Sequence, residues 1–268
     1  MSCSLPPEIL DFIIDQLHNE PTTLKACCVV SKSWIPRTRR HLFARVDFGG
    51  RAIPIESWMK IFPDPSNSPA HHTRSLSICS LPVLVTTTNA DVASCVRTFR
   101  NVVRLRFKHL TWTGQQNPLT PFYGFSHTVR SLRLTSTSFE VFNLVCSFPL
   151  LENLALVSLG SEVGAAGWNA PSTSPELTGS LSLSMMMGEI RPAILRLLDF
   201  PDGLRFTKIT VSRLGESDFE PMMDLVSKCS GTLECLTISS FTISAFPSAS
   251  LVGRYLTAKN RDAQGVSP

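Results

Sequence analysis

The sequence predicts an α/β protein in which three short N-terminal helices precede an irregular solenoid with a short-stranded parallel sheet. Apolar residues recur at helical spacing over about the first fifty residues. Beyond about residue 73, a short unit of two apolar residues flanking one other residue returns at intervals of 29, 27, 22, 27, 28 and 27 residues. Repeats of that length are typical of stacked strand and helix units that share one core.

Composition excludes several classes of protein. With 43% hydrophobic and 17% charged residues in 268 positions, the chain has enough apolar surface to fold. No run reaches the roughly 18 apolar residues of a membrane span, and Glu8, Asp11 and Asp15 interrupt any apolar signal segment. The net charge of +4 falls short of the strongly basic pattern of a nucleic-acid-binding protein. We therefore expect a soluble protein that acts neither in a membrane nor on nucleic acid.

The eight cysteines indicate a reducing compartment. None belongs to a Cys-x-x-Cys pair, and none has a histidine nearby at zinc-binding spacing. We therefore expect the cytoplasm or the nucleus as the location, and no metal or other cofactor. The sequence also holds no phosphate-binding glycine loop and no nucleophile elbow, so we assign no catalytic residues and do not expect an enzyme.

The segment SLPPEILDFIIDQL, residues 4–17, predicts an amphipathic helix. Ser4 and the prolines after Leu5 mark its start, and the polar stretch HNEPTT ends it. On a helical wheel its apolar residues fall within one arc of about 140°. These residues are Ile9, Leu10, Ile13, Ile14 and Leu17.

A second helix is predicted to begin with Thr22 or Thr23 as its cap and to continue through LKACCVVSKSW to Trp34. A third helix, PRTRRHLFARV, begins with Pro36 in its first turn, runs to Val46 and contributes Leu42 and Phe43. Three short helices have too little interior to bury all of this apolar surface. We therefore expect another surface, either the rest of the chain or a partner, to cover part of it.

Three blocks of residues carry a resemblance to a known family. They are Leu5-Pro6-x-Glu8-Ile9-Leu10, then Val30-Ser31-Lys32-Ser33-Trp34, then Leu42-Phe43. In order and spacing they resemble an F-box, the module that joins a substrate receptor to the S-phase-kinase-associated (SKP) adaptor of a cullin–RING ubiquitin ligase. The wider arrangement resembles the F-box proteins that are common in mushroom-forming fungi.

The resemblance implies a function as well as a fold. Residues 1–48 would form the F-box, which would bind the SKP-family adaptor and, through it, the cullin. The chain would then be the substrate-recognition subunit of an SCF-type ubiquitin ligase, without chemistry of its own. The implied adaptor contacts are Leu5, Pro6, Ile9, Leu10, Leu24, Val30 and Trp34.

The remaining chain predicts a degenerate leucine-rich-repeat region. After a linker with a short helix at 49–72, helical candidates at 89–102, 138–148, 190–200 and 217–229 separate the strands of residues 73–240. The seven strand units are Leu76/Ile78, Leu105/Phe107, Leu132/Leu134, Leu154/Leu156, Leu181/Leu183, Ile209/Val211 and Leu236/Ile238. A loop interrupts at 164–175, and residues 241–268 are expected to form a C-terminal tail.

The middle residue of each unit points away from the core, and two neighbouring units carry arginine there, Arg106 and Arg133. Like charges on adjacent strands, about 5 Å apart, destabilise a sheet unless something negative lies beside them. We expect an acidic or phosphorylated segment of an unknown target protein at this place. The alternatives are a solvated basic face and pairing with a carboxylate of the same chain.

A second interpretation of the whole chain is a repeat-domain interaction scaffold without a ligase role, in which the first helices only cap the repeats. Co-expression with the adaptor separates the two interpretations, because only the receptor predicts a stable complex.

Overall fold

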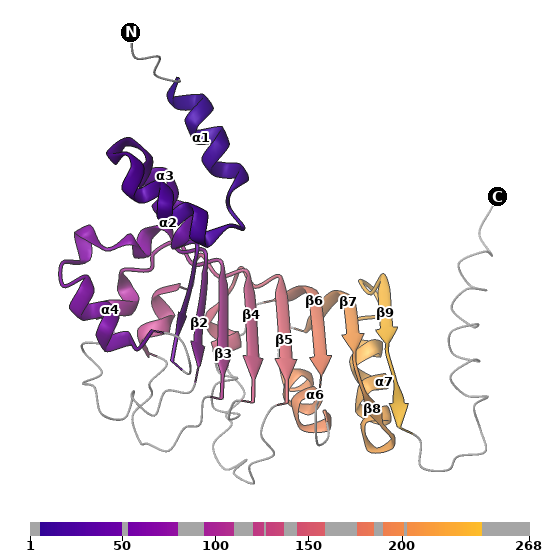
Figure 1. The fold of residues 1–268 in the computed structure, drawn as a ribbon. Helices are drawn as coiled ribbons and strands as arrows, with labels where there is room; N and C mark the ends of the chain where they lie inside the picture. Colours follow the sequence, from indigo (N-terminus) through magenta and orange to yellow (C-terminus); the bar gives the residue numbers. More distant parts are fainter. Residues whose placement is uncertain are drawn as a thin grey trace.

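A computed structural model describes residues 6–49, 53–79, 94–109, 120–125, 127–136, 144–158, 176–184, 190–200 and 203–242. These residues form a mixed α/β fold built on an eight-stranded sheet (Figure 1). All pairs in this sheet are parallel, and its strands follow one another in chain order. The expected α/β class with a parallel sheet is confirmed. None of the helices in the described ranges has the length and apolar character that a membrane crossing requires.

All seven predicted strand units lie in this sheet, paired residue for residue, so Leu76 stands beside Leu105 and Leu105 beside Leu132. The inward side chains therefore form continuous rows across the strands. The strands are β1 (Arg45–Phe48), β2 (Ser75–Cys79), β3 (Arg104–Lys108), β4 (Ser131–Thr135), β5 (Asn153–Val157), β6 (Leu177–Ser184), β7 (Leu204–Val211) and β9 (Cys235–Ile238). A separate pair joins β8 (Leu214–Gly215) to β10 (Phe241–Thr242).

Strand β1 is an addition to the predicted strands. The third predicted helix is wrong at its end: it stops at Leu42 instead of Val46, and Arg45 and Val46 belong to β1. Its RVDF sequence has the same alternation as the other units, and Val46 and Phe48 are buried. β1 pairs with β2 along its whole length, so Asp47 lies beside Ser77. The sheet thus begins one repeat earlier than predicted.

Helices cover the inner side of the sheet and complete the core. α6 (Arg191–Leu198) and α7 (Phe219–Lys228) lie behind the strands in Figure 1 and confirm two of the predicted helices. Ile194 of α6 and Leu225 of α7 are fully buried in the same core as the strand residues. The 3-10 helix η5 (Thr120–Phe125) adds Phe122, and residues 94–97 are helical. Since each strand unit has an apolar side that it cannot cover alone, stacking and these helices exclude water from it.

Three strands end in the same uncommon backbone conformation. His109, Ser136 and Ser158 directly follow β3, β4 and β5 and have positive φ angles of 53°, 48° and 49°. Each backbone N–H donates a 2.8 Å hydrogen bond to a carbonyl oxygen of the next strand, such as that of Thr135 for His109. Non-glycine residues adopt this conformation at some cost, so its repetition marks structurally equivalent turns.

The first helices are α1 (Pro7–Gln16), α2 (Pro21–Val30), the 3-10 helix η1 (Lys32–Trp34) and α3 (Ile35–Leu42). The predicted course of the second helix is wrong at both ends. It starts with Pro21 in its first turn, and it stops at Val30 because Ser31 is extended, with φ −151° and ψ 140°. The hydroxyl of Ser31 accepts a 3.3 Å hydrogen bond from the N–H of Ser33, which starts the separate 3-10 turn.

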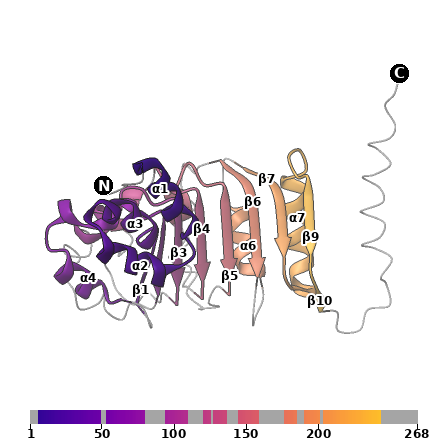
Figure 2. The ribbon, with the colours of Figure 1, turned by 45° about the horizontal axis from the view of Figure 1, so that its top comes forward.

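An aromatic cluster fixes the start of the sheet. Trp58 of α4 (Ile55–Ile61) has its ring centroid 5.9 Å from Phe43, 5.7 Å from Phe48 and 5.5 Å from Phe99. Two further 3-10 turns follow, η2 (Pro65–Asn67) and η3 (Pro69–His72). The helices α1–α3 lie beyond the ends at which the first strands begin (Figure 1). When the top of the molecule is turned forward, they come to lie in front of the first strands (Figure 2). The predicted loop at 164–175 lies outside the described residues. Of the predicted tail at 241–268, Phe241 and Thr242 form β10 instead, and the rest lies outside the described residues.

Candidate protein-binding surfaces

Helix α1 divides its apolar residues between two strips. One strip faces inward, with Ile14 only 2% exposed and Leu10 half-buried. The other strip faces outward, where Ile9, Phe12 and Ile13 are 47%, 63% and 45% exposed. At 100° per residue these three lie side by side on the helix. α1 therefore shows an apolar strip to solvent.

Helix α2 has the same division. Leu24 and Cys27 are buried, at 1% and 8% exposure, whereas Val29 and Val30 in its last turn are 86% and 65% exposed. Each helix thus carries an outward apolar group, Ile9, Phe12 and Ile13 on α1 and Val29 and Val30 on α2. We call the two groups together the α1–α2 apolar surface.

This surface is unusual within the molecule. Ten large apolar side chains of the described residues are exposed, and five of them belong to two helices of ten residues each. The other five are scattered between Ile53 and Phe219, where single exposed apolar residues need no explanation. A concentration of such residues on short helices is typical of a surface that a partner covers.

An ion-pair cluster holds α1 against α3. Arg37 Nε donates a 2.6 Å hydrogen bond to Asp15 Oδ1, its Nη2 donates to Oδ2, and His41 Nε2 lies 2.7 Å from Oδ1. The Arg37 hydrogen bonds, helped by His41, hold the pKa of the Asp15 carboxyl well below its usual range. The same contacts raise the pKa of Arg37. The cluster fixes which strip of α1 faces outward.

Thr38 joins α2 to α3 in a second polar contact. It is fully buried, and its hydroxyl donates to the backbone oxygen of Trp34 at 2.8 Å, with the oxygen of Ile35 at 3.0 Å. The Cys28 thiol lies 3.0 Å from the same hydroxyl oxygen. These side chains pack α2 and α3 together independently of the sheet core.

The predicted adaptor contacts fall into different environments. Pro6, Ile9 and Val30 are exposed, and Leu10 and Trp34 are half-buried. Leu24 is covered by the chain itself, because it faces inward with Cys27. Leu5 lies outside the described residues.

Three exposed members of the α1–α2 apolar surface, Phe12, Ile13 and Val29, were not among the predicted contacts. Phe12 lies outside the arc that the helical wheel treats as the apolar side. Its spacing of three residues from Ile9 was the signal that could have identified it.

The outer face of the sheet places Arg106 and Arg133 side by side, and both are exposed. The register confirms that they occupy equivalent positions in β3 and β4. In the same row Asp47 and Ser77 precede them on β1 and β2, and Ala155 follows on β5.

Carboxylates at the starts of nearby strands are already paired with other arginines. Glu152 accepts a hydrogen bond from Arg130, and Glu176 lies 2.6 Å from Arg205. Within the described ranges neither Arg106 nor Arg133 takes part in an ion pair. The alternative of pairing with a carboxylate of the same chain therefore finds no support among these residues.

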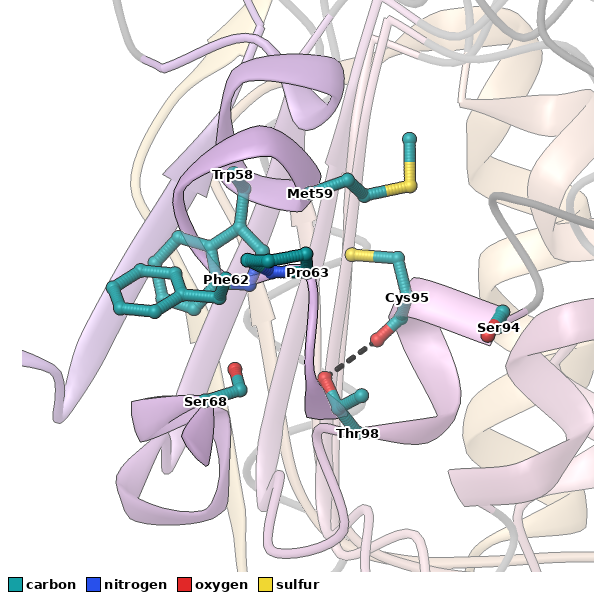
Figure 3. Close-up of a pocket in the computed structure, with 8 residues that line it drawn as sticks. All are labelled: Trp58, Met59, Phe62, Pro63, Ser68, Ser94, Cys95 and Thr98. Carbon is teal, nitrogen blue, oxygen red and sulfur yellow. Dashed lines mark hydrogen bonds between the residues drawn. The ribbon is translucent and has the colours of Figure 1, made fainter. Parts of the chain in front are cut away.

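A small hollow of about 120 Å³ lies between α4 and the helical turn at 94–97 (Figure 3). It is far below the roughly 300 Å³ from which small-molecule sites begin. Burial raises the pKa of the Cys95 thiol in its wall to about 12, so this sulfur is not a ready nucleophile. The lining residues are Trp58, Met59, Phe62, Pro63, Ser68, Ser94, Cys95 and Thr98.

No group of three or more metal-binding side chains occurs among the described residues. A comparison with models of known protein families finds no match to this sequence, and a comparison with curated proteins finds none either. Two surfaces thus remain as candidates for binding: the α1–α2 apolar surface and the outer face of the sheet around β3.

Proposed function

We propose that this protein is the substrate-recognition subunit of an SCF-type cullin–RING ubiquitin ligase. Its first helices would bind an SKP-family adaptor, which links it to the cullin, and its sheet would hold a target protein. The protein would carry out no chemistry; it would raise the concentration of the target near the ubiquitin-conjugating enzyme. It would act in the cytoplasm or the nucleus.

The observation that carries this proposal is the α1–α2 apolar surface. Ile9 and Val30, two of the residues that carry the resemblance to an F-box, belong to this surface and are 47% and 65% exposed. Burying apolar side chains contributes about 25 cal/mol per Å² of area removed from water, so covering this surface would stabilise a complex. The polar contacts of Asp15 and Thr38 hold the helices in place without using that surface.

The arrangement of the rest of the chain supports the same proposal. The strand units recur in register along one parallel sheet, with helices on its inner side, as expected of a degenerate leucine-rich-repeat solenoid. Such sheets leave a broad outer face that can bind another protein. The division into an adaptor-binding segment, residues 1–48, and a target-binding segment, residues 73–240, follows from this proposal.

Co-expression of the intact chain with an SKP-family adaptor tests the adaptor-binding role. We expect the unchanged chain to form a stable complex, and the double variant Ile9→Ser with Val30→Ser to weaken it at least tenfold, since central apolar contacts dominate interface energies. The double variant Ile61→Ser with Leu195→Ser is a matched control, because these residues are 62% and 43% exposed on other elements. Binding is measured by calorimetry.

Equal thermal unfolding midpoints for both variants would show that loss of the complex is not caused by unfolding. Failure of the intact chain to bind the adaptor, or equal weakening by both double variants, would refute the proposal. The first of these outcomes would favour an interaction scaffold without a ligase role.

A further inference from the structure

Strand β3 presents a basic side chain at every outward position. Arg104, Arg106 and Lys108 alternate with the buried Leu105 and Phe107. Arg133 of β4 stands directly beside Arg106. Four basic side chains thus stand together on two neighbouring strands, while Arg45 on β1 and Lys208 on β7 lie two or more strands away.

Acidic side chains do not neutralise this group within the described part of the chain. The one carboxylate in the same row of β1–β4, that of Asp47, is two strands from Arg106, or about 10 Å at the usual strand spacing. The carboxylates of Glu152 and Glu176, just before β5 and β6, are paired with other arginines. Only solvent or a ligand is therefore available to offset the repulsion between Arg106 and Arg133.

Two buried hydroxyl groups flank the same strand. Ser77, only 4% exposed, is the β2 neighbour of Arg106, and Thr135 is the β4 neighbour of Lys108. The oxygens of both hydroxyls are inaccessible to solvent and have no hydrogen-bond partner. Buried polar groups without partners are rare because they cost free energy, so each calls for an explanation. Both hydroxyls could donate to an anion.

We propose that this part of the sheet, the β3 basic face, binds an anionic segment of a target protein through carboxylate or phosphate groups. We define it by Arg104, Arg106, Lys108, Arg133, Ser77 and Thr135. The proposal names the class of target and so rests on the proposed function as a substrate receptor. Arginine at two adjacent positions suits planar, bidentate contacts with either anion.

The geometry favours an extended segment with alternating acidic residues. Outward positions along β3 repeat every two residues, or about 6.6 Å, which is also the spacing of alternate side chains in an extended chain. A segment along β3 would thus place every second side chain opposite Arg104, Arg106 and Lys108.

The face has no aromatic side chain on the described strands β1–β4 for stacking on bases, and the net charge of the chain is only +4. These features favour a protein segment over a nucleic acid.

Fluorescence anisotropy with the intact chain tests the proposal. The probes are a labelled ten-residue peptide with glutamate at every second position, its counterpart with phosphoserine at two of those positions, a neutral glutamine version, and single-stranded oligothymidylate. We expect the glutamate or the phosphoserine peptide to bind, and the comparison of the two identifies which anion the face prefers. The glutamine peptide should bind at least tenfold more weakly than the preferred anionic one.

Variants then locate the binding. Arg106→Gln with Arg133→Gln should weaken binding of the anionic peptide at least tenfold, whereas Arg205→Gln, an exposed arginine of the same sheet, should change it less than twofold. Ser77→Ala should weaken binding severalfold without lowering the unfolding midpoint, because its hydroxyl has no internal partner to lose. A purely structural role of Ser77 predicts a lower unfolding midpoint and unchanged binding of the peptide.

No binding of either anionic peptide, equal effects of Arg205→Gln and the double variant, or tighter binding of oligothymidylate at the same arginines would each overturn the proposal. The adaptor measurement is independent of this one. An intact chain that binds the peptide but no adaptor would refute the ligase role and support the anion site. A chain that binds the adaptor but no anionic peptide would refute the anion site and support the ligase role.

Discussion

The N-terminal helices and the sheet treat their apolar residues differently. In the sheet, Leu105 and Phe107 are completely buried, and their neighbours in the same rows are buried too. In α1, only Ile14 is buried, while Phe12 is 63% exposed. The buried apolar residues of α1 and α2 also lie outside the continuous core of the sheet.

The contrast shows that the two regions differ in what covers their apolar side chains. Repeat units cover one another, since each strand of the sheet has a neighbour with the same pattern. Three short helices have no such neighbour on their outer side, so polar contacts such as that between Asp15 and Arg37 fix their arrangement instead. An outer apolar strip held in place in this way is suited to binding.

The largest expected effect comes from truncating matched aromatic residues in the two regions. Phe107→Ala should lower the free energy of unfolding by about 3–5 kcal/mol, because it removes a fully buried ring and leaves a cavity. Phe12→Ala should change it by less than about 0.5 kcal/mol, because that ring is mostly in water. Urea denaturation measures both. Similar losses for the two variants would abolish the contrast.

A smaller loss is expected where the sheet has no room for an added methyl group. Gly179 has φ +78° at the irregular step between β6 and β7, and a Cβ there would overlap the backbone oxygen of Glu152. Gly179→Ala should therefore destabilise the protein by about 1–3 kcal/mol. Gly231→Ala is the control, because a Cβ at that position meets nothing within 4 Å. Equal unfolding midpoints for the two variants would contradict the prediction.

The smallest effect is expected from the polar contacts between the helices. Asp15→Asn should cost about 1 kcal/mol at pH 7, a modest value because the side chain is 34% exposed and water screens its ion pairs. The pKa of Asp15 is lowered in the folded state, so its contribution is complete above the ordinary carboxyl pKa and declines as the pH falls below it.

Urea denaturation of the wild type and of Asp15→Asn at pH 7 and pH 3 measures this dependence. The difference between the two proteins should shrink at pH 3. Asp11→Asn on the same helix serves as the control and should show the smaller difference at pH 7. A difference that is the same at both pH values would mean that Asp15 acts by packing rather than by charge.

Much of the sheet could be predicted from the sequence, because the alternation in units such as Leu132/Leu134 requires a strand with one buried side. β1 was not predicted because the predicted third helix extended over its first residues, Arg45 and Val46. The end of α2 at Val30 was not predicted for a related reason. The apolar pattern continues past Ser31, and only the extended backbone of Ser31 ends the helix. Of the β3 basic face, Arg106 and Arg133 were predicted, but the unpartnered hydroxyls of Ser77 and Thr135 were not.

The sequence by itself determined the period of the repeats, the helical character of the first residues and the two arginines at equivalent positions, because these depend only on local spacing. The tertiary structure decided which strip of α1 is left in solvent, since the helical wheel treats Ile9 and Ile14 alike and only contacts with α3 distinguish them. It also placed Arg106 beside Ser77 and Lys108 beside Thr135, two residues whose hydroxyls have no partner. Such neighbours come from different strands, and only the pairing register brings them together.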